Sequence, residues 1–455
     1  TLTYEDVANV DSVGIITART GVNVSGGQLD VGSNIKIGNA GVITATTFSG
    51  SGASLTNLPA ANLTGTLPAI SGASLTGINT AFGSGTSVNT TGIITATAFV
   101  PTQGQLSHRN LVINGSMQVA QRNTSSTSSG LKTIDRWTMN WSGGGVTQSQ
   151  VSEQSGTVFE NGFSNYLRIT NTSNTTTDTD YRFIGHTMEA QFVANSGWNH
   201  KSSSSYVTLS AWVRSSLAGT YYGWLNSRDG SGHTYTFSYT LSANTWTKVI
   251  KTIPGNSNVQ IHNNTEEGLV IHFIPWYGTY YSTSGHTLDA WQTSSSTNRC
   301  PDYAQNWANT SNATFDVTGV QLEVGPVATP FEHRSEADEL ARCQRYCVVY
   351  GTDESRHLGT AHAYNSTNLN LSIHVPVAMV KKPSASTVTS GGNWLQSYMG
   401  ANGNISNASI SVGDHGEGHT AMRLYLQNAH SGLTAGQALW LHTIANAKLI
   451  LSADI

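Results

Sequence analysis

The sequence predicts an all-β protein with a jelly-roll β-sandwich in its middle. Between residues 107 and 334, apolar and polar side chains alternate in several short segments, as they do in strands with one buried face. Turn-forming clusters of Gly, Ser, Asn and Asp separate these segments, and none of them has helical periodicity. Short repeats rich in Ile, Val and Thr precede the sandwich. We therefore expect strands throughout, with one short helix after residue 334.

Composition restricts the classes of partner. The 455 residues allow two or three domains, and charged residues make up 11% of them, with a net charge of −4. Because no basic run occurs, nucleic acid is not an expected partner. The sequence has neither an apolar stretch of membrane-spanning length nor a basic-then-apolar signal sequence. We expect no membrane insertion and no export by a signal of its own.

Residues 1–106 contain repeats that predict an intertwined shaft. The motifs are GIITAR, GVITAT and GIITAT, at residues 14–19, 41–46 and 92–97, and SGASLT, at residues 51–56 and 71–76. Each reads as a short strand closed by turn residues, and such periods are typical of extended arrays. The region has no Trp and few other aromatic residues, so one chain alone buries too little apolar surface to offset its ordering entropy. A disordered linker is the alternative, but the regular repeats favour several identical chains wound about one axis.

Residues 107–334, the predicted sandwich, contain three strands with especially clear alternation. The apolar faces of these strands comprise Val207, Leu209, Ala211 and Val213 in the first, Tyr235, Phe237, Tyr239 and Leu241 in the second, and Leu269, Ile271 and Phe273 in the third. His272 lies on the opposite face of the third strand.

A closing strand and a short helix mark the end of the sandwich. Apolar residues alternate from Phe315 and again from Val320, and the shift of phase at Gly319 predicts a β-bulge. Two prolines then break regular structure, and Ser335 has the position of a helix N-cap before an acidic first turn. We predict a short helical linker over residues 335–348 and a distal β tip domain over residues 349–455.

The cysteines predict free thiols. Cys300, Cys343 and Cys347 are an odd number, and the last two are one helical turn apart. This usage is typical of a protein assembled in a reducing cytoplasm, so we expect no structural disulfide.

Aromatic residues in a loop-like segment form the candidate ligand site. Core packing is the commoner role of any single Trp, but residues 274–291 combine several rings with Gly, Ser, Thr, His and Asp. Sugars present apolar C–H faces ringed by hydroxyls, so flat rings with short polar partners suit them. The candidates are Trp276, Tyr277, Tyr280, Tyr281 and Trp291, with Tyr222 and Trp224 on one strand face as a second group. Ordinary loop anchoring or a subunit contact is the alternative.

The tip offers a further candidate region. Alternation at residues 369–377 and around Met422, Leu439 and Lys448 predicts strands, and Pro376 makes the first of these an edge strand or ends its pairing. Residues 393–420 read as loop-rich, with Trp394 and Tyr398 as candidate ligand-binding residues. His415, Glu417 and His419 alternate, but two glycines and the lack of a fourth ligand argue against a metal, and we expect no cofactor.

Catalysis is not expected. Glycoside hydrolysis needs two carboxylates poised across the bond, and no spacing in the predicted sandwich indicates such a pair. Nucleophile-elbow, zinc-protease and phosphate-loop motifs are also absent from the sequence.

Two segments resemble a known family. The run VQLEVGPVATPFEHRS with ELARCQRYC, at residues 320–335 and 339–347, resembles the junction of a family of tailed-phage tail-fibre proteins. NLVINGSMQVAQR with IDRW, at residues 110–122 and 134–137, is similar to the start of that family's carbohydrate-binding-like sandwich, and PVAMVKKPSAS, at residues 376–386, to the start of its terminal domain. The GIITA and SGASLT repeats look like those of fibres from phages of marine cyanobacteria, which would make the host a cyanobacterium.

The resemblance implies an elongated homotrimer located in the virion and assembled in the host cytoplasm. Its N-terminal shaft would join other tail or baseplate proteins. The protein would bind a host cell-surface polysaccharide or lipopolysaccharide, and three-fold display of its sites would give avidity. Two other functions stay open at this point: a structural connector or decoration spike without an external ligand, and a polysaccharide depolymerase.

Overall fold

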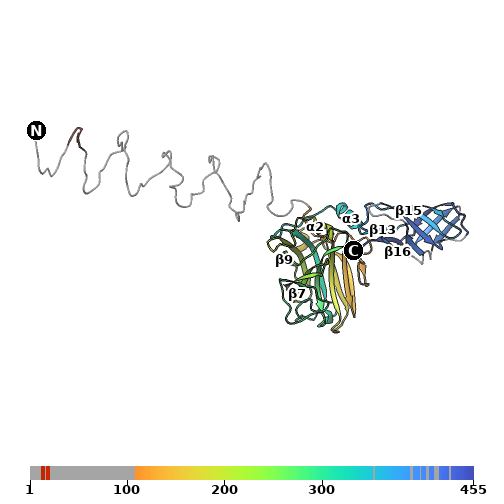
Figure 1. Cartoon of the computed structure of the whole chain (residues 1–455), viewed down its shortest axis with the longest axis horizontal. Helices are drawn as coiled ribbons and strands as arrows, with labels where there is room; N and C mark the ends of the chain where they lie inside the picture. The colour runs from red at the N-terminus through yellow and green to blue at the C-terminus, as the bar shows by residue number, and fades with distance from the viewer. Residues whose placement is uncertain are drawn as a thin grey trace. The chain divides into compact units, whose positions relative to one another are not determined.

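The computed structural model describes residues 12–15, 17–20, 108–351, 354–389, 393–399, 401–405, 409–413, 420–429 and 432–455, and of Tyr398, Met399 and residues 401–405 the backbone alone (Figure 1). Residues 108–455 belong to one compact unit. Nearly all of the predicted shaft, and all of the GDHGEGHT segment but its first and last residues, lie outside the described residues. The predicted domain boundaries and the homotrimer stay predictions.

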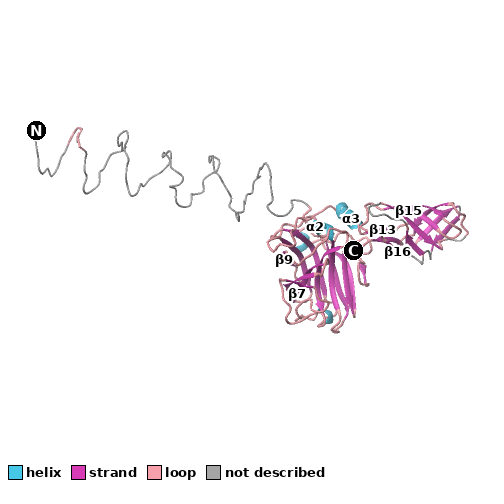
Figure 2. Ribbon diagram, viewed as in Figure 1, coloured by secondary structure: helices cyan, strands magenta, loops and turns pink. Residues whose placement is uncertain are grey.

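Two antiparallel six-stranded sheets form a sandwich, which Figure 2 shows as two groups of long strands. The first sheet, sheet A, has the order β1 (Ser125–Ser126), β3 (Gly145–Ser152), β4 (Asn165–Ser173), β12 (Thr314–Val324), β6 (Tyr206–Ser215) and β9 (Thr247–Pro254). The second, sheet B, has the order β11 (Trp291–Thr293), β8 (His233–Leu241), β7 (Gly219–Ser227), β10 (Glu267–Tyr277), β5 (Tyr181–Glu189) and β2 (Trp137–Ser142). The prediction of an all-β fold with a β-sandwich is confirmed.

The main core lies between the two sheets. The predicted apolar faces of β6, β8 and β10 are all buried in it, so period-two alternation identified the inward side chains correctly. Sheet B also carries a second apolar cluster on its outer face, formed by Tyr222, Trp224, Val270, Ile274, Tyr277 and Cys300. Sheet B is therefore covered on both faces, which alternation alone does not reveal.

Strand β12 contains the predicted bulge. Its register with β6 shifts between Thr318 and Gln321, and Gly319 has φ +60°, the left-handed region that glycine enters without strain. A Cβ at residue 319 would lie 2.7 Å from the ring of Phe163. The position therefore requires glycine for both its backbone conformation and its close approach to a neighbouring ring.

We expect Gly319→Ala to lower the free energy of unfolding by about 2–3 kcal/mol, because left-handed strain and a steric clash add together. Gly197→Ala is the control, since Gly197 has φ +86° and no atom within 4 Å of an added Cβ. The free energy of unfolding of this control should fall only by the contribution of backbone strain, about 1 kcal/mol. Chemical denaturation of both variants measures the difference, and equal losses would contradict the steric part of this account.

The helices are short: α1 (Thr157–Glu160), α2 (Ala190–Ala194), the 3₁₀ turn η3 (Trp307–Asn309) and α3 (Glu336–Gln344). Helix α3 begins as predicted, because Ser335 is its N-cap and the Ser335 hydroxyl accepts a hydrogen bond from the Asp338 amide at 3.2 Å. Within the described residues, no helix has the length and apolar character needed to cross a membrane.

Residues after α3 form two further antiparallel sheets around a separate apolar core. The three-stranded sheet has the order β13 (Cys347–Tyr350), β22 (Lys448–Ser452) and β16 (Ser384–Val388). The seven-stranded sheet has the order β18 (Ala401–Ile405), β17 (Leu395–Met399), β21 (Ala438–Thr443), β14 (His357–Ala363), β15 (Leu369–His374), β20 (Ala421–Gln427) and β19 (Ser409–Val412).

The prediction of a loop-rich segment over residues 393–420 was wrong for β17, β18 and β19. These strands form because β17 pairs with both β18 and β21, while β19 pairs with β20. Strand β15 is paired on both sides and ends at His374, so Pro376 ends the strand and does not mark an edge.

Buried polar contacts join β5 to α3 and β13. The Glu189 carboxylate, at the end of β5, accepts hydrogen bonds from the Arg345 guanidinium at 2.8 and 3.0 Å and from the Tyr346 hydroxyl at 2.7 Å. Arg122 and Arg136 both form ion pairs with Asp454, two residues after β22. Cys300, Cys343 and Cys347 are buried free thiols.

Candidate functional site

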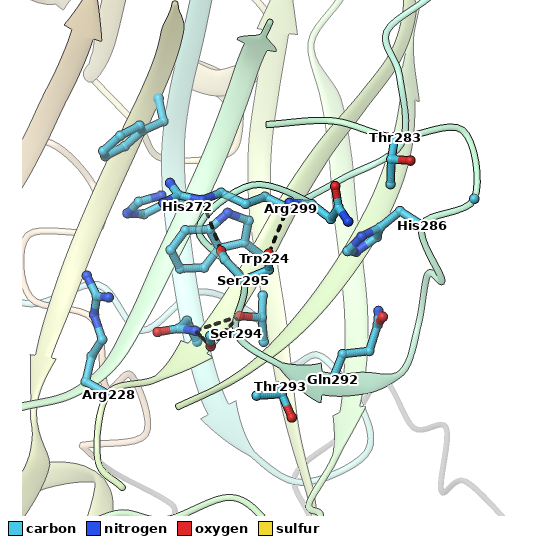
Figure 3. Close-up of a pocket in the computed structure, with 15 residues that line it drawn as sticks. Trp224, Arg228, His272, Thr283, His286, Gln292, Thr293, Ser294, Ser295 and Arg299 are labelled. Carbon is cyan, nitrogen blue, oxygen red and sulfur yellow. Dashed lines mark hydrogen bonds between the residues drawn. The ribbon is translucent and has the colours of Figure 1, made fainter. Parts of the chain in front are cut away.

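The candidate site lies on the outer face of sheet B, under the connection from β10 to η3. A pocket of about 430 Å³ opens there (Figure 3). It is lined by Phe183, Trp224, Asn226, Arg228, Thr234, His272, Thr283, Gly285, His286, Gln292, Thr293, Ser294, Ser295, Asn298 and Arg299. Strands β5, β10, β7 and β8 supply the floor, and the segment from Thr283 to Arg299 supplies the wall.

Three packed rings form the floor, of which Phe183 is half-buried and His272 and Trp224 are each 5% exposed. The His272 ring lies 4.1 Å from the Phe183 ring, nearly parallel to it, and 3.8 Å from the Trp224 ring, measured between centroids. His272 and Trp224 are direct partners on β10 and β7, and Gly185 is the partner of His272 on β5. A Cβ at residue 185 would lie 2.8 Å from the His272 ring, so glycine provides the space that this ring occupies.

His272 is neutral at neutral pH. Burial holds its pKa well below 6.5, and the nearby Arg228 and Arg299 guanidinium groups lower it further. Burial also lowers the pKa of His286. Among the described residues, neither His272 Nδ1 nor His286 Nε2 has a hydrogen-bond partner, although both atoms are buried.

A polar network forms one wall. The Asn226 amide donates to the Thr234 and Ser294 hydroxyls at 2.6 Å each, and these two hydroxyls lie 2.9 Å apart, as the dashed lines in Figure 3 show. Arg299 Nε donates to the Ser295 carbonyl at 3.3 Å. The network fixes the side chains of β7 and β8 against the wall segment, so the pocket is preformed.

Backbone hydrogen bonds hold the wall segment in place. The Arg299 amide donates to the Tyr281 carbonyl at 2.8 Å, the Thr283 amide to the Cys300 carbonyl at 3.0 Å, and the Asp289 amide to the Thr236 carbonyl of β8 at 2.8 Å. Because its ends pair with each other and its middle pairs with β8, the segment keeps one conformation over the sheet.

Among the described residues that line this pocket, none is an Asp or Glu. The lining therefore lacks the pair of carboxylates that hydrolysis of a glycosidic bond ordinarily requires. What it offers is an aromatic floor, amides, hydroxyls, two neutral imidazoles and two guanidinium groups, a set suited to binding a polar ligand.

A smaller pocket of about 220 Å³ continues the site toward β2. It shares Phe183, Arg228 and His272 with the main pocket, and adds Arg136, Glu267 and other residues of the β2 side. The two pockets adjoin at these three shared residues, and together they are the groove on the outer face of sheet B.

The predicted candidates among residues 274–291 do not all lie in a loop. Strand β10 runs to Tyr277, so Trp276 and Tyr277 are strand residues, buried to 8% and 2% exposure, and the loop interpretation was wrong for them. Trp291 lies in β11 and its Nε1 donates to the Pro254 carbonyl at 2.6 Å. Tyr281 is half-buried and packs on Tyr277 and Tyr280, and Tyr280 is 48% exposed.

The remaining predicted candidates are also mostly buried or away from the main pocket. Tyr222 is buried and its hydroxyl donates to the Asp302 carbonyl at 3.4 Å. Trp394 is 1% exposed, which contradicts its predicted place in an exposed loop, and the Tyr398 backbone lies in β17. Of the predicted residues whose side chains the structure describes, Trp224 alone lines the main pocket. Ligand binding by the predicted set stays a prediction.

Sequence reasoning missed most of the pocket. Phe183, His272 and Arg299 come from segments far apart in the chain, and only the pairing of β5, β7 and β10 unites the first two with Trp224. One signal was present: His272 interrupts an apolar run on the face opposite to Leu269 and Ile271. Sequence reasoning also missed Trp440, which is 62% exposed on β21 beside His357.

No protein-family model and no curated protein matches the sequence. Comparison with solved structures finds a domain of tailspike protein 4 of bacteriophage CBA120, at 12% identity and a TM-score of 0.27, covering 48% of this chain and 21% of that one. A protein described as "CBM4 structure and function" matches at 11% identity and a TM-score of 0.25, covering 47% of this chain and 99% of that one. A putative sugar binding protein of Bacteroides thetaiotaomicron matches at 10% identity and a TM-score of 0.24, covering 48% and 100%.

The chain thus spans about a fifth of the length of the tailspike domain that it matches. Because all these TM-scores are far below 0.5, the likenesses carry no argument about function. The conclusions below rest on the strands, the pocket and the sequence motifs of the chain itself.

Proposed function

We propose that this protein is a virion tail fibre that recognises a surface glycan of a host bacterium without acting on it chemically. The observation that carries the proposal is the pocket on sheet B, where a floor of stacked rings meets amide, hydroxyl and imidazole groups and no carboxylate lines the wall. A sugar ring lies with its apolar face on such a floor, and its hydroxyls pair with the polar wall. The assignment to a phage fibre rests on the sequence resemblance.

Homotrimeric assembly is part of the proposal. Three pockets on one fibre raise the strength of attachment to a repetitive surface far above that of a single site, because the second and third contacts are intramolecular. Light scattering on the purified chain should give three times the mass of one chain. A monomer would contradict the assembly, while leaving the pocket itself to be judged by binding.

The test is binding of the full chain to intact cells of a panel of cyanobacterial strains, with and without periodate oxidation of their surface sugars. We expect saturable binding to some strains and its loss after periodate. In the double variant Gln292→Ala/Asn298→Ala, which removes two amides from the pocket wall, binding should weaken about tenfold or more, as loss of hydrogen bonds worth about 1 kcal/mol each implies.

The control is Gln154→Ala/Asn258→Ala, which removes two exposed amides that do not line the pocket. It should bind like the unmodified protein. Absence of binding to all strains would favour the connector hypothesis, and saturable binding that resists periodate would contradict a glycan ligand. Release of soluble oligosaccharide from the cells would instead favour the depolymerase hypothesis.

A further inference from the structure

The charged side chains that line the groove indicate which class of glycan it suits. Three guanidinium groups line the main pocket and its continuation: Arg136, Arg228 and Arg299. Arg136 is paired with Asp454, at 3.5 Å, and its guanidinium covers the Tyr346 ring at 3.6 Å. Arg228 is paired with Glu267, at 3.1 Å. Both of these charges are therefore compensated within the protein.

Arg299 differs from the other two. Within the part of the chain that the structure describes, no Asp or Glu forms an ion pair with it, and none lines the main pocket. Its Nε donates to the Ser295 carbonyl, and its guanidinium stands over the Tyr281 ring at 5.1 Å. One backbone contact and one ring thus orient the group, and a guanidinium carries five N–H donors in all.

Placing the Arg299 guanidinium here without a counter-charge raises the electrostatic free energy of the folded protein. A half-buried guanidinium beside stacked rings has lost part of its hydration, and an opposite charge is the usual compensation in proteins. The whole chain has a net charge of −4, so general attraction cannot draw a polyanion to it. A preference for anions would have to arise locally, at this pocket.

We propose that the glycan bound in this pocket is acidic, and that Arg299 holds its carboxylate or sulfate group. The planar fork of a guanidinium pairs with either anion through two parallel hydrogen bonds. An acidic sugar carries its charge at the edge of the ring, so its apolar face can lie on the half-buried Phe183 ring, beside the 5% exposed Trp224, while the anion reaches Arg299. This inference rests on the proposed function of the same pocket.

The test measures binding of the full chain to paired probes by isothermal titration calorimetry. The probes are a galacturonic acid tetramer and its methyl ester, and a sulfated carrageenan oligosaccharide and its desulfated form. We expect at least one acidic probe to bind about tenfold more tightly than its neutral twin, the range that a charge-assisted hydrogen bond implies. The preferred pair distinguishes carboxylate from sulfate.

Variants assign the preference to one side chain. Arg299→Gln should remove the difference between acidic and neutral twins, and Arg299→Lys should restore it in part, since lysine keeps the charge without the fork. Lys248→Gln is the matched control, because it removes one exposed positive charge from β9 of sheet A. It should leave the difference unchanged.

The outcomes separate this inference from the proposed function. Equal binding of both twins in every pair, or a preference that survives Arg299→Gln, would overturn the inference. Absence of binding to all four probes, together with periodate-sensitive attachment to cells that Arg299→Gln leaves intact, would also overturn it while the proposed function stands. Loss of periodate sensitivity in the cell assay would reject the proposed function.

Discussion

Glu189→Gln should lower the free energy of unfolding by about 3 kcal/mol, one of the two largest effects that we expect in this protein. The Glu189 carboxylate is fully buried and accepts hydrogen bonds from Arg345 and from the Tyr346 hydroxyl. Glutamine keeps the shape but removes the charge, and one of its two terminal groups donates where an acceptor is required. Arg345 then lacks its counter-charge. Urea denaturation followed by tryptophan fluorescence measures the loss.

A matched control is available on the surface. Arg356 and Glu354 form an ion pair at 2.6 Å, shorter than the ion pair of Glu189 with Arg345, but both side chains are more than 60% exposed. Water screens exposed pairs, so Glu354→Gln should leave stability almost unchanged. If the two substitutions had equal effects, burial would not be the cause of the stabilisation at Glu189.

Trp394→Ala should cost about 3–5 kcal/mol, because it opens a large cavity in the core of the C-terminal sheets. The Trp394 side chain is 1% exposed, and its backbone carbonyl accepts a hydrogen bond from the Ile444 amide at 3.2 Å. Any loss of cell binding by this variant would report unfolding of these sheets, not a lost ligand contact. A thermal melt recorded beside the binding assay makes the distinction.

Trp440→Ala is the corresponding surface substitution in the same sheet. Trp440 is 62% exposed on β21, so its removal should change stability by no more than about 0.5 kcal/mol. The two tryptophans thus separate a structural role from a surface role within one sheet. A large loss of stability from Trp440→Ala would show that this face is covered by another copy of the chain or by another protein.

The sequence predicted best where local chemistry decides the structure. Alternation located β6, β8 and β10 because a strand with one face in the core repeats every two residues. The bulge at Gly319 and the start of α3 at Ser335 followed from a phase shift and from a capping residue, both of which depend on a few neighbouring residues.

The candidate loop failed for a physical reason that is visible at Pro275. The Gly, Ser and Thr residues among the rings made residues 274–291 read as a loop, yet β10 continues through Pro275 to Tyr277. The register of β10 with β5 shifts between Phe273 and Trp276, so the sheet accommodates the proline at an irregular position. A bulge of this kind depends on the partner strand, which the local sequence does not contain.

The pocket depends even more on distant parts of the chain. Phe183, His272 and Trp224 become neighbours only through the order β7-β10-β5, and Arg299 joins them because its segment folds back over the sheet. Strand β18 is similar, since its Gly- and Asn-containing sequence has low strand propensity and is held by pairing with β17, which in turn pairs with β21.

The order of strands in the three-stranded sheet has a consequence for how the protein is made. Strand β22, which leaves the ribosome last of all the strands described, is the middle strand between β13 and β16. A chain released before residue 448 would therefore expose two unpaired strand edges and would lack Asp454, the partner of Arg122 and Arg136. Proteases and chaperones act on such exposed edges, so incomplete translation products should be degraded before they can accumulate.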